Sequence, residues 1–344
     1  MVRGLPQKQS LPTLKNTSLP KLPPRDADTI MELVKEALNG SERAIAQLIT
    51  MVENERPGWI EVMKEIYPHT GNAYLIGFTG PTGSGKSTLV DRVALALSDQ
   101  DYSVGIIAID PSSPFTGGAL LGDRIRMHDI TGRENVFIRS LGTRGGLGGI
   151  SQATSDVIKI LDASGKEFIL IETIGIGQDE VEIAQVADAS IVVSVPGLGD
   201  DIQTIKAGIM EIGDIFVVNK ADRAGADHVV TMIRAMLDLN SPSSLWKQPV
   251  IKTVATENQG IDELIEHISL HRTYLTEKDR LTTKRKERVG REISRLLEQK
   301  ISRYVHERIK EIQPLEELVE QISNREKDPY SCADLLLAIL EKKN

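Results

Sequence analysis

Seven apolar runs alternate with helical stretches between residues 73 and 255. Continuous apolar runs, unlike alternating ones, are typical of strands buried on both faces of a parallel sheet. The alternation of strand and helix therefore predicts an α/β fold, a mostly parallel sheet with helices on both faces. The predicted strands are Ala73–Thr79, Val104–Ile109, Val136–Ile138, Phe168–Ile171, Ile191–Val195, Ile215–Val218 and Val250–Val254.

Helical patterns flank this alternating region on both sides. Apolar residues recur at helical spacing from Ile30 to Leu38, Ser41 can cap a second helix, and a third spans about Trp59 to Ile66. After the last strand, a long charged helix is predicted from about Lys278 to Ile312. Two shorter helices follow, and the last one opens after Pro329.

The long predicted helix carries an apolar stripe that a domain edge cannot cover alone. It must pack on its own chain or on a second copy, and its length favours a homodimer through residues 270–344. The stripe consists of Val289, Ile293, Leu296, Leu297, Ile301, Val305 and Ile309.

Composition narrows the class of protein. The chain has 344 residues, enough for two domains, and its net charge of −8 disfavours a nucleic-acid partner. Its single cysteine, Cys332, excludes an intrachain disulfide and fits a reducing compartment. No apolar run is long enough for a membrane span and no secretory signal is recognisable, so we expect a cytoplasmic protein without a membrane partner.

The first 25 residues differ from the rest. They hold five prolines and five basic residues but no acid, which predicts a disordered arm. A mitochondrial transit peptide is also basic and acid-poor, but these prolines would break the amphipathic helix that it needs. A location in the mitochondrial matrix is expected only if the source is eukaryotic.

The strongest chemical signal joins the first strand to a helix. Its pattern, G-x-x-x-x-G-K-[ST], is that of a phosphate-binding P-loop, in which glycines let backbone N–H groups surround phosphate oxygens. Lys86 should reach the β- and γ-phosphates, and the Ser87 hydroxyl should hold Mg²⁺. The predicted nucleotide-binding residues are Gly80, Pro81, Thr82, Gly83, Ser84, Gly85, Lys86, Ser87 and Thr88.

Three carboxylates are candidates for the metal side of this site. Asp110 follows the second strand, where it could face Mg²⁺ or the attacking water, although a turn former before Pro111 is the alternative. Asp123 lies in a glycine-rich segment and could instead cap a helix. Glu172 closes the fourth strand, as a Walker B acid does, in a place usually held by Asp.

Further candidates lie in loops beyond the predicted strands. Gly175 could offer its N–H to the γ-phosphate, and Gln178 could position water, although its offset differs from that in small GTPases. The segment from Pro196 to Lys206 reads as a mobile loop that opens a helix, and Lys206 is either functional or solvated. The run Gly145–Gly149 is assigned no role.

The sixth strand leads into a base-recognition motif. Asn219-Lys220-Ala-Asp222 fits the Asn-Lys-x-Asp pattern, in which the carboxylate accepts hydrogen bonds from N1–H and the exocyclic amine of guanine. Adenine lacks this pair of donors, so the motif predicts selection of GTP and GDP over ATP. The last strand ends in Thr253, Val254 and Ala255, and the Ala255 N–H could meet guanine O6.

Together these stretches resemble the MeaB/ArgK/MMAA group of P-loop GTPases over roughly residues 30–340. The motifs specific to this group are above all Asp110-Pro-Ser-Ser and the stretch after Pro196. The resemblance implies a GTPase that chaperones an adenosylcobalamin-dependent acyl-CoA mutase, chiefly methylmalonyl-CoA mutase, and that dimerises through C-terminal helices. It implies that Asp200 and Lys206 lie on a third switch loop that communicates with the mutase. The predicted catalytic residues are Lys86, Asp110, Glu172 and Lys206.

The resemblance and the patterns divide the chain into four parts. These are a disordered arm (1–25), a helical extension (26–70), a P-loop GTPase domain (71–268) and a helical dimerisation region (269–344). A kinase of a lysine/arginine/ornithine transport system is the alternative function. A metal-insertion GTPase for a nickel enzyme is less favoured, because six scattered His and one Cys do not form a metal-relay cluster.

Overall fold

The protein is described here by a computed structural model, which divides into two compact units. One unit contains residues 1–71 and 156–165, and the other contains 72–155 and 166–344. The structure describes residues 27–110, 130, 132–142, 152–173, 179–197, 207–240, 245–310 and 315–342. Asp123, Gly145–Gly149, Gly175, Gln178, Asp200 and Lys206 lie outside the described residues, as does the N-terminal arm.

The smaller unit is helical, as its apolar spacing predicts. Its helices bury one face each, and Ser41 caps α2 as predicted, since its Oγ accepts from Ala44 N at 3.4 Å. Asp162, near the end of α6, accepts from the Gly71 N–H at 2.6 Å. The helices that precede the sheet are α1 (Ala27–Leu38), α2 (Glu42–Glu53), α3 (Trp59–Ile66) and the short η1 (Tyr67–His69), and α6 (Gln152–Ala163) contributes residues 156–163.

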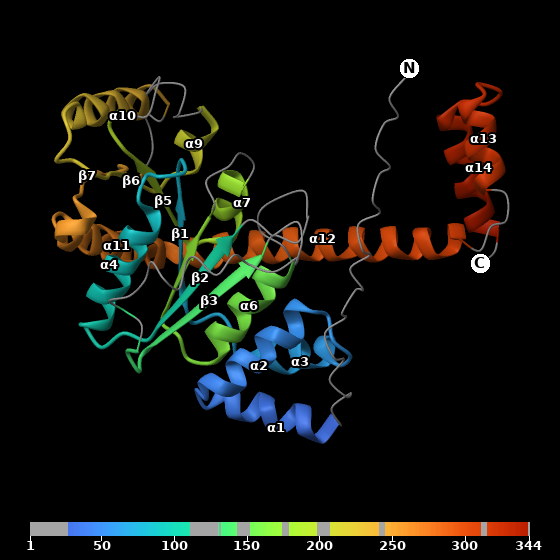
Figure 1. The fold of residues 1–344 in the computed structure, drawn as a ribbon, viewed down its shortest axis with the longest axis horizontal. Helices are drawn as coiled ribbons and strands as arrows, with labels where there is room; N and C mark the ends of the chain where they lie inside the picture. The colour runs from blue at the N-terminus through green and yellow to red at the C-terminus, as the bar shows by residue number, and fades with distance from the viewer. Residues whose placement is uncertain are drawn as a thin grey trace, which may run out of the picture. The chain divides into compact units, whose positions relative to one another are not determined.

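Among the described residues, the larger unit is built on one parallel sheet of seven strands, in the order β3-β2-β4-β1-β5-β6-β7 (Figure 1). This confirms the predicted α/β fold. The later strands add to the side of β1 away from β2, so the chain order reverses there, and ligands of such sheets bind at this point. The strands are β1 (Tyr74–Thr79), β2 (Val104–Asp110), β3 (Val136–Gly142), β4 (Phe168–Glu172), β5 (Ala189–Ser194), β6 (Ile215–Val218) and β7 (Val250–Lys252).

Strand β3 is longer than its apolar pattern predicts. It was expected to end at Ile138, yet it pairs with β2 as far as Gly142 opposite Asp110. Backbone hydrogen bonds carry this pairing, so the polar Arg139 and Ser140 do not end it on an edge strand. The strand β7 is shorter than predicted and leaves the sheet after Lys252.

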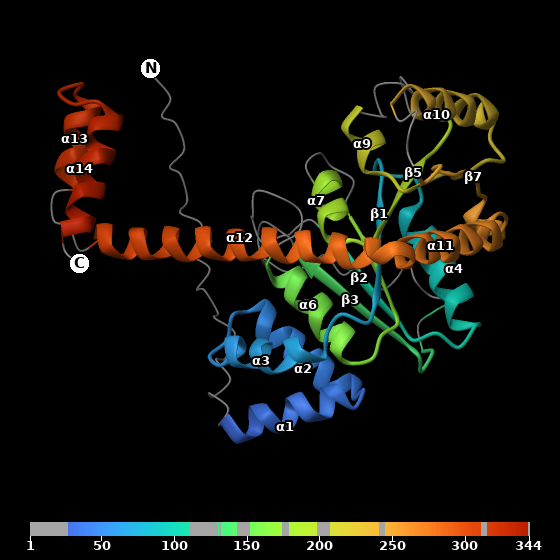
Figure 2. The ribbon, with the colours of Figure 1, turned by 180° about the vertical axis from the view of Figure 1, so that it is seen from behind.

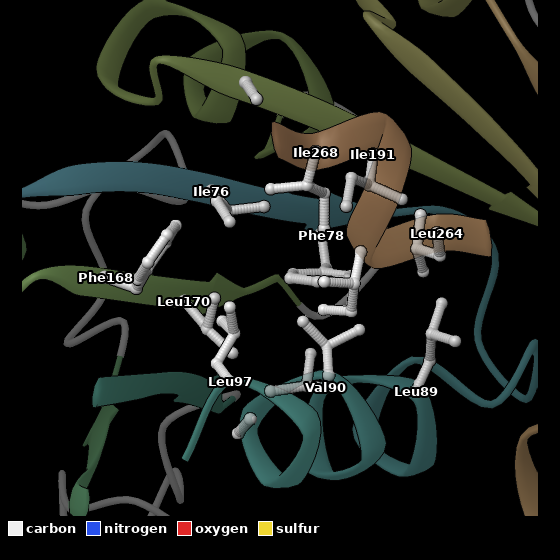
Figure 3. Packing of buried hydrophobic residues seen from close by; sticks show 14 of the residues in the cluster. Ile76, Phe78, Leu89, Val90, Leu97, Phe168, Leu170, Ile191, Leu264 and Ile268 are labelled. Carbon is white, nitrogen blue, oxygen red and sulfur yellow. The ribbon is translucent and has the colours of Figure 1, made fainter. Parts of the chain in front are cut away.

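The central strand β1 is buried on both faces. On one face, Ile76 and Phe78 pack against α4 (Lys86–Ser98) and α11 (Ile261–Thr276), as Figure 3 shows. Leu89, Val90 and Leu97 of α4 and Leu264 and Ile268 of α11 complete this layer. The element α11 is one that the predicted pattern lacks, and residue 268, the expected end of the GTPase domain, lies inside it.

The other face of the sheet carries α7 (Asp179–Val186), α9 (Ala207–Ile212) and α10 (Ala226–Asn240). Gly77 of β1 lies under α7, and a Cβ built on it would come within 2.2 Å of Cγ1 of Ile183. The absent side chain therefore lets this helix approach the strand closely. The helix α10 packs its buried residues on β6.

The C-terminal arm, which we define as α12 (Arg280–Lys310), α13 (Leu315–Ser323) and α14 (Pro329–Lys342), follows α11 through the short η3 (Glu277–Asp279). The long helix, predicted from about Lys278, begins at Arg280. Lys278 has a φ of +54°, a left-handed conformation that separates α11 from α12. The last helix opens at Pro329 as predicted, and proline at the first helical turn needs no N–H partner. No helix among the described residues is long and apolar enough to span a membrane.

A buried polar cluster lies where β1 and β6 begin, opposite the carboxyl ends of the strands. The Tyr74 hydroxyl is 2.8 Å from Nδ1 of His271, and Nε2 of His271 is 3.5 Å from Asp214 Oδ1. Burial raises the pKa of Tyr74 well above its ordinary value, and Asp188 and Asp214 act in the same direction. The Tyr74 hydroxyl therefore stays neutral and lies within hydrogen-bonding distance of His271.

The carboxyl group of Asp214 experiences opposing influences. Burial acts to raise its pKa, but the hydrogen bond with His271 and the charge of Lys284 outweigh burial and hold the pKa below its ordinary value. The carboxylate also accepts from the Ser190 N–H at 2.8 Å. Asp214 is thus an ionised anchor for both α11 and the start of α12.

A second buried carboxylate fixes α12 to the sheet. The Asp188 side chain is 0% exposed, and its Oδ2 accepts from Arg285 at 2.9 Å and from Leu75 N at 3.1 Å. Arg288 lies 3.4 Å from its Oδ1, and Arg285 also donates to the Ala73 carbonyl at 2.7 Å. Removing one partner of such a buried pair typically costs about 3–5 kcal/mol. These contacts hold the beginning of α12 against the amino-terminal edge of the sheet.

We predict that Gly77→Ala lowers the free energy of unfolding by about 1–3 kcal/mol, because the new methyl group would overlap Ile183. Urea unfolding followed by circular dichroism measures the effect. In an Ile183→Ala background the same substitution should cost less, since the overlapping atoms are gone. Additive losses in the double variant would contradict this account.

Candidate nucleotide-binding site

The predicted P-loop lies where the central strand meets its helix. Residues 80–85 connect β1 to α4, and α4 begins at Lys86, so the N–H groups of its first turn point toward the loop. Gly80, Gly83 and Gly85 have φ values of +138°, +80° and +89°, which L side chains rarely adopt. The sequence pattern thus produces the backbone geometry that surrounds an anion.

Two of these glycines are also required by space. A Cβ on Gly80 would lie 2.1 Å from the carbonyl oxygen of Val193 in β5. A Cβ on Gly85 would lie 2.5 Å from Nδ2 of Asn219, in the predicted base-recognition motif. The loop is therefore pressed against both β5 and the segment after β6.

Lys86 folds back over the loop that precedes it. Its ammonium donates to the carbonyl of Gly80 at 2.9 Å and to that of Pro81 at 3.2 Å, and the side chain is buried. The ammonium is thus held against the backbone of the loop that the motif assigns to phosphate. Its contact with the β- and γ-phosphates stays a prediction.

Ser87 and Glu172 meet as the sequence predicts. The Ser87 hydroxyl donates to Glu172 Oε1 at 2.7 Å, and Glu172 is buried at the end of β4. In the sheet, Glu172 pairs with Phe78 of β1 and Ala108 of β2. A hydroxyl and a carboxylate are oxygen ligands of the kind that Mg²⁺ takes while keeping several waters and phosphate oxygens.

Asp110 ends β2 at the same edge of the sheet. It lies two residues beyond Ala108, the residue that pairs with Glu172, and opposite Gly142 of β3. This places the Asp110 backbone near the Walker B position. Among the described residues, no group of three or more His, Cys, Asp or Glu side chains is arranged to hold a metal ion.

The Asn219 side chain joins three segments. Its Nδ2 donates to the Ser84 carbonyl of the P-loop at 2.9 Å. Its Oδ1 accepts from the Thr253 hydroxyl at 3.1 Å and from the Ala255 N–H at 3.2 Å. Asn219 is buried, so all three bonds are shielded from water. We define these contacts as the Asn219 brace.

Lys220 adds a second link between the same segments. Its ammonium donates to the Gly83 carbonyl at 2.7 Å, and its backbone has a φ of +55°. The N–H of Ala221 donates to the Thr253 carbonyl at 3.1 Å. The chain therefore turns sharply, and Asp222, one residue further, is exposed.

The predicted residues after β7 divide into two roles. Thr253 and Ala255 both bond to Asn219. The Ala255 N–H, which was predicted to meet guanine O6, donates in this structure to Asn219 Oδ1. Val254 N donates to Gln259 O at 3.1 Å, which closes the turn after β7. The remaining predicted residues, Thr82 and Thr88, lie in the loop and in the first turn of α4.

Thr173 is a site residue that the motifs do not single out. Its hydroxyl lies 3.2 Å from the Phe78 carbonyl and 3.3 Å from the Thr79 hydroxyl, and its N–H donates to the same carbonyl at 3.1 Å. It ties the end of β4 to the end of β1, immediately before the P-loop. Its place directly after Glu172 is the signal that could have identified it.

A phosphate-binding loop after the central strand, a carboxylate on its Ser87 and a braced Asn-Lys-x-Asp turn are the parts of a P-loop GTPase. The family model described as "Methylmalonyl Co-A mutase-associated GTPase MeaB" matches residues 45–310. The chain belongs to this MeaB family, so the protein is a GTPase that binds guanine nucleotide.

Relatives in several organisms are similar to this chain over most of its length. A Pyrococcus abyssi protein is 50% identical over 311 residues, or 90% of this chain and 96% of that one. GTPase ArgK of Escherichia coli is 36% identical over 263 residues, covering 74% and 79%. The mitochondrial methylmalonic aciduria type A homolog of Mus musculus is 31% identical over 281 residues, covering 79% and 66%.

A solved structure shares the fold. The crystal structure of LAO/AO transport system kinase aligns with a TM-score of 0.68 at 24% identity, over 93% of this chain and 100% of that one. At this identity the likeness concerns the fold alone.

We predict that Asn219→Ala lowers the affinity for both GDP and GTP by about tenfold or more. Ser84 O and the Ala255 N–H lose a buried partner, and each such loss costs about 1–3 kcal/mol. Ser84→Ala is the matched control, because the Ser84 Oγ is buried with no hydrogen-bond partner in the part of the chain that the structure describes, while its carbonyl is retained. It should change affinity less than about twofold. Titration with a fluorescent guanine nucleotide measures both, and equal losses would reject the brace.

Proposed function

We propose that the protein is a GTP-dependent chaperone of an adenosylcobalamin-dependent acyl-CoA mutase of the methylmalonyl-CoA mutase type, gating cofactor loading and protecting the mutase. The match to a family described by its association with that mutase carries the proposal. The mouse relative, named for methylmalonic aciduria type A, supports it. The GTPase provides a two-state signal, and the mutase would read it.

The path of β5 offers a physical route for this signal. Its end lies against the P-loop, since Val193 O approaches the Gly80 backbone and Ser194 O accepts from the Asn219 N–H at 2.8 Å. The segment from Pro196 to Lys206 leaves from this point. A loop that starts beside the nucleotide can respond to its γ-phosphate, which fits the third switch that the resemblance implies for Asp200 and Lys206.

Within this function, we assign Lys86 to the β- and γ-phosphates and Asp222 to the guanine. Ser87 and Glu172 would hold Mg²⁺, which would neutralise phosphate charge when bound. Asp110 and Asp123 would be further carboxylates on that side. Gly175 would donate its N–H to the γ-phosphate. Lys86 and the N-terminal turn of α4 then stabilise the charge that builds on the leaving phosphate oxygens.

The kinase alternative has weaker support. Its basis is the fold shared with LAO/AO transport system kinase, whereas ArgK of Escherichia coli, at higher identity, is named a GTPase. A kinase must also pass its phosphate to an acceptor that stays phosphorylated. Phosphoprotein in place of free phosphate would therefore favour the alternative.

We predict that methylmalonyl-CoA mutase binds the protein differently with GDP and with a non-hydrolysable GTP analogue, and that it accelerates GTP hydrolysis. Coupling of this kind typically changes affinity by about 5- to 150-fold. Phosphate release, with and without the mutase, measures the acceleration, and calorimetry measures the affinities.

Two controls accompany this assay. An unrelated protein in place of the mutase tests specificity, and Lys86→Ala, which removes the phosphate-facing cation, tests for contaminating GTPase. If turnover and affinity are indifferent to the mutase while the unmodified protein hydrolyses GTP, the chaperone proposal fails and the GTPase assignment stands.

We also propose that the protein forms a homodimer through the C-terminal arm and acts in the cytoplasm. One face of α12 carries arginines three and four residues apart that contact other elements of the larger unit, namely Arg288, Arg291 and Arg295. Ile293 and Leu297 lie on the far side of α12 and are 61% and 56% exposed. Such a stripe on a helix whose opposite face is already docked suits a second copy of the same helix.

We predict that Ile293→Asp with Leu297→Asp converts the dimer into a monomer. The two side chains are exposed within one chain, so the monomer should keep its melting temperature and its nucleotide affinity. Light scattering coupled to gel filtration measures the mass, with Glu298→Gln as a control on the same helix. A full-length parent that is monomeric at micromolar concentration would refute the dimer.

A further inference from the structure

Helix α7 connects the nucleotide site to the C-terminal arm. Glu172 ends β4 at the site, and α7 begins at Asp179, seven residues later. On its inner side, Ile183 packs directly over Gly77 of β1, the strand that enters the P-loop three residues further on. A displacement of α7 therefore changes the packing of β1 immediately before the phosphate-binding loop.

The other end of α7 is held by arginines from α12, which passes beside it (Figure 2). Arg288 donates to the Val186 carbonyl, and Arg291 donates to the Gln185 carbonyl at 3.3 Å. The last carbonyls of a helix have no partner within it, so these bonds cap α7. Positive charges at a helix C-terminus also stabilise it through the helix dipole.

Arg288 extends this hold into the sheet. It lies 3.4 Å from Asp188, two residues beyond α7 and one before β5. The Asp188 N–H donates to the Leu75 carbonyl of β1 at 2.8 Å. Arg288 of α12 therefore contacts the end of α7 directly, and through the buried Asp188 it is linked to the starts of β5 and β1.

We propose that Arg288 and Arg291 are positioning residues for GTP hydrolysis, which hold α7 in place and make turnover depend on the C-terminal arm. Neither residue is near the P-loop in sequence, and neither needs to touch nucleotide. The two arginines act on the P-loop indirectly, through two contacts of α7. One is the arginine cap at its end, and the other is the packing of Ile183 on Gly77 along its inner face. Because coupling is reciprocal, a nucleotide-dependent shift of α7 also acts on α12.

The test compares the parent with Arg288→Ala/Arg291→Ala, using the full chain and GTP itself. We expect kcat to fall by about three- to tenfold while KM for GTP changes less than about twofold, because the P-loop is intact and only α7 is loosened. Amide exchange at Ala187, whose N–H bonds to the Ile183 carbonyl, should rise about tenfold, while exchange within α10 stays unchanged.

Three matched variants separate this role from general destabilisation. Lys286→Ala removes an exposed positive charge from the same helix and should keep the parental kcat. Arg285→Ala removes contacts to Asp188 and to the Ala73 carbonyl, and it leaves the bonds of Arg288 and Arg291 to α7 in place. It should lower the melting temperature without the loss in kcat. Arg291→Lys retains a cation that can reach a carbonyl and should keep at least about half of the parental kcat.

Arg291→Ala alone guards against misfolding of the double variant, because Arg291 is exposed and the Asp188 contacts remain. All proteins are compared at equal mass by light scattering. A parental kcat in Arg291→Ala with unchanged exchange at Ala187 would overturn the proposal. So would an equal loss of kcat in Arg285→Ala, since that would point to the sheet edge and not to α7.

Discussion

The site depends on the Asn219 brace more than on any other single interaction. A loop that contains three glycines with positive φ is costly to order, because glycine loses more backbone freedom on folding than other residues. The amide of Asn219 contributes to ordering it by holding the Ser84 carbonyl, and Lys220 holds the Gly83 carbonyl beside it. The P-loop and the turn at Asn219 and Lys220 are therefore joined by direct hydrogen bonds, which fix the separation between these two segments.

The opposite edge of the sheet is organised by buried charge. The Asp188 side chain is fully buried, and it is tolerated because Arg285, Arg288 and the Leu75 N–H surround it. Such a cluster adds less net stability than a well-packed apolar one would, but it accepts few alternative arrangements. Its consequence is orientation: α12 can dock only with its arginines inward, which turns Val289 and Ile293 outward.

The two edges of the sheet carry different groups of residues. The carboxyl ends of β1, β4, β5 and β6 carry the groups for nucleotide, an arrangement shared by P-loop GTPases in general. The amino ends of β1, β5 and β6 carry the attachment of the C-terminal arm, which such a core does not require. A fold of this kind does not define a partner, so what distinguishes a MeaB-family GTPase must lie in the elements added to the core.

The local motifs allowed the carboxyl edge to be predicted from sequence alone. The P-loop, Glu172 and Asn219 each follow a strand, and parallel strands bring their carboxyl ends together, so Glu172 was expected beside Ser87 and lies there. Short-range signals were sufficient for Ser41 as a helix cap and Pro329 as a helix start. These features depend on residues close in sequence or on strand order, which apolar runs reveal directly.

Only the tertiary structure decided the amino edge. Asp188, Arg285 and Arg288 look like solvated charges in sequence, and His271 lies on α11, whose apolar spacing did not stand out. Their partners are about 100 to 200 residues away in the chain, as for Arg285 with Asp188 and His271 with Tyr74. Burial of a charge depends on what packs around it, and no periodicity encodes a partner at that distance. The sequence therefore determined which motif residues gather at the carboxyl edge, and three-dimensional packing determined how α12 is attached and which of its faces is left exposed.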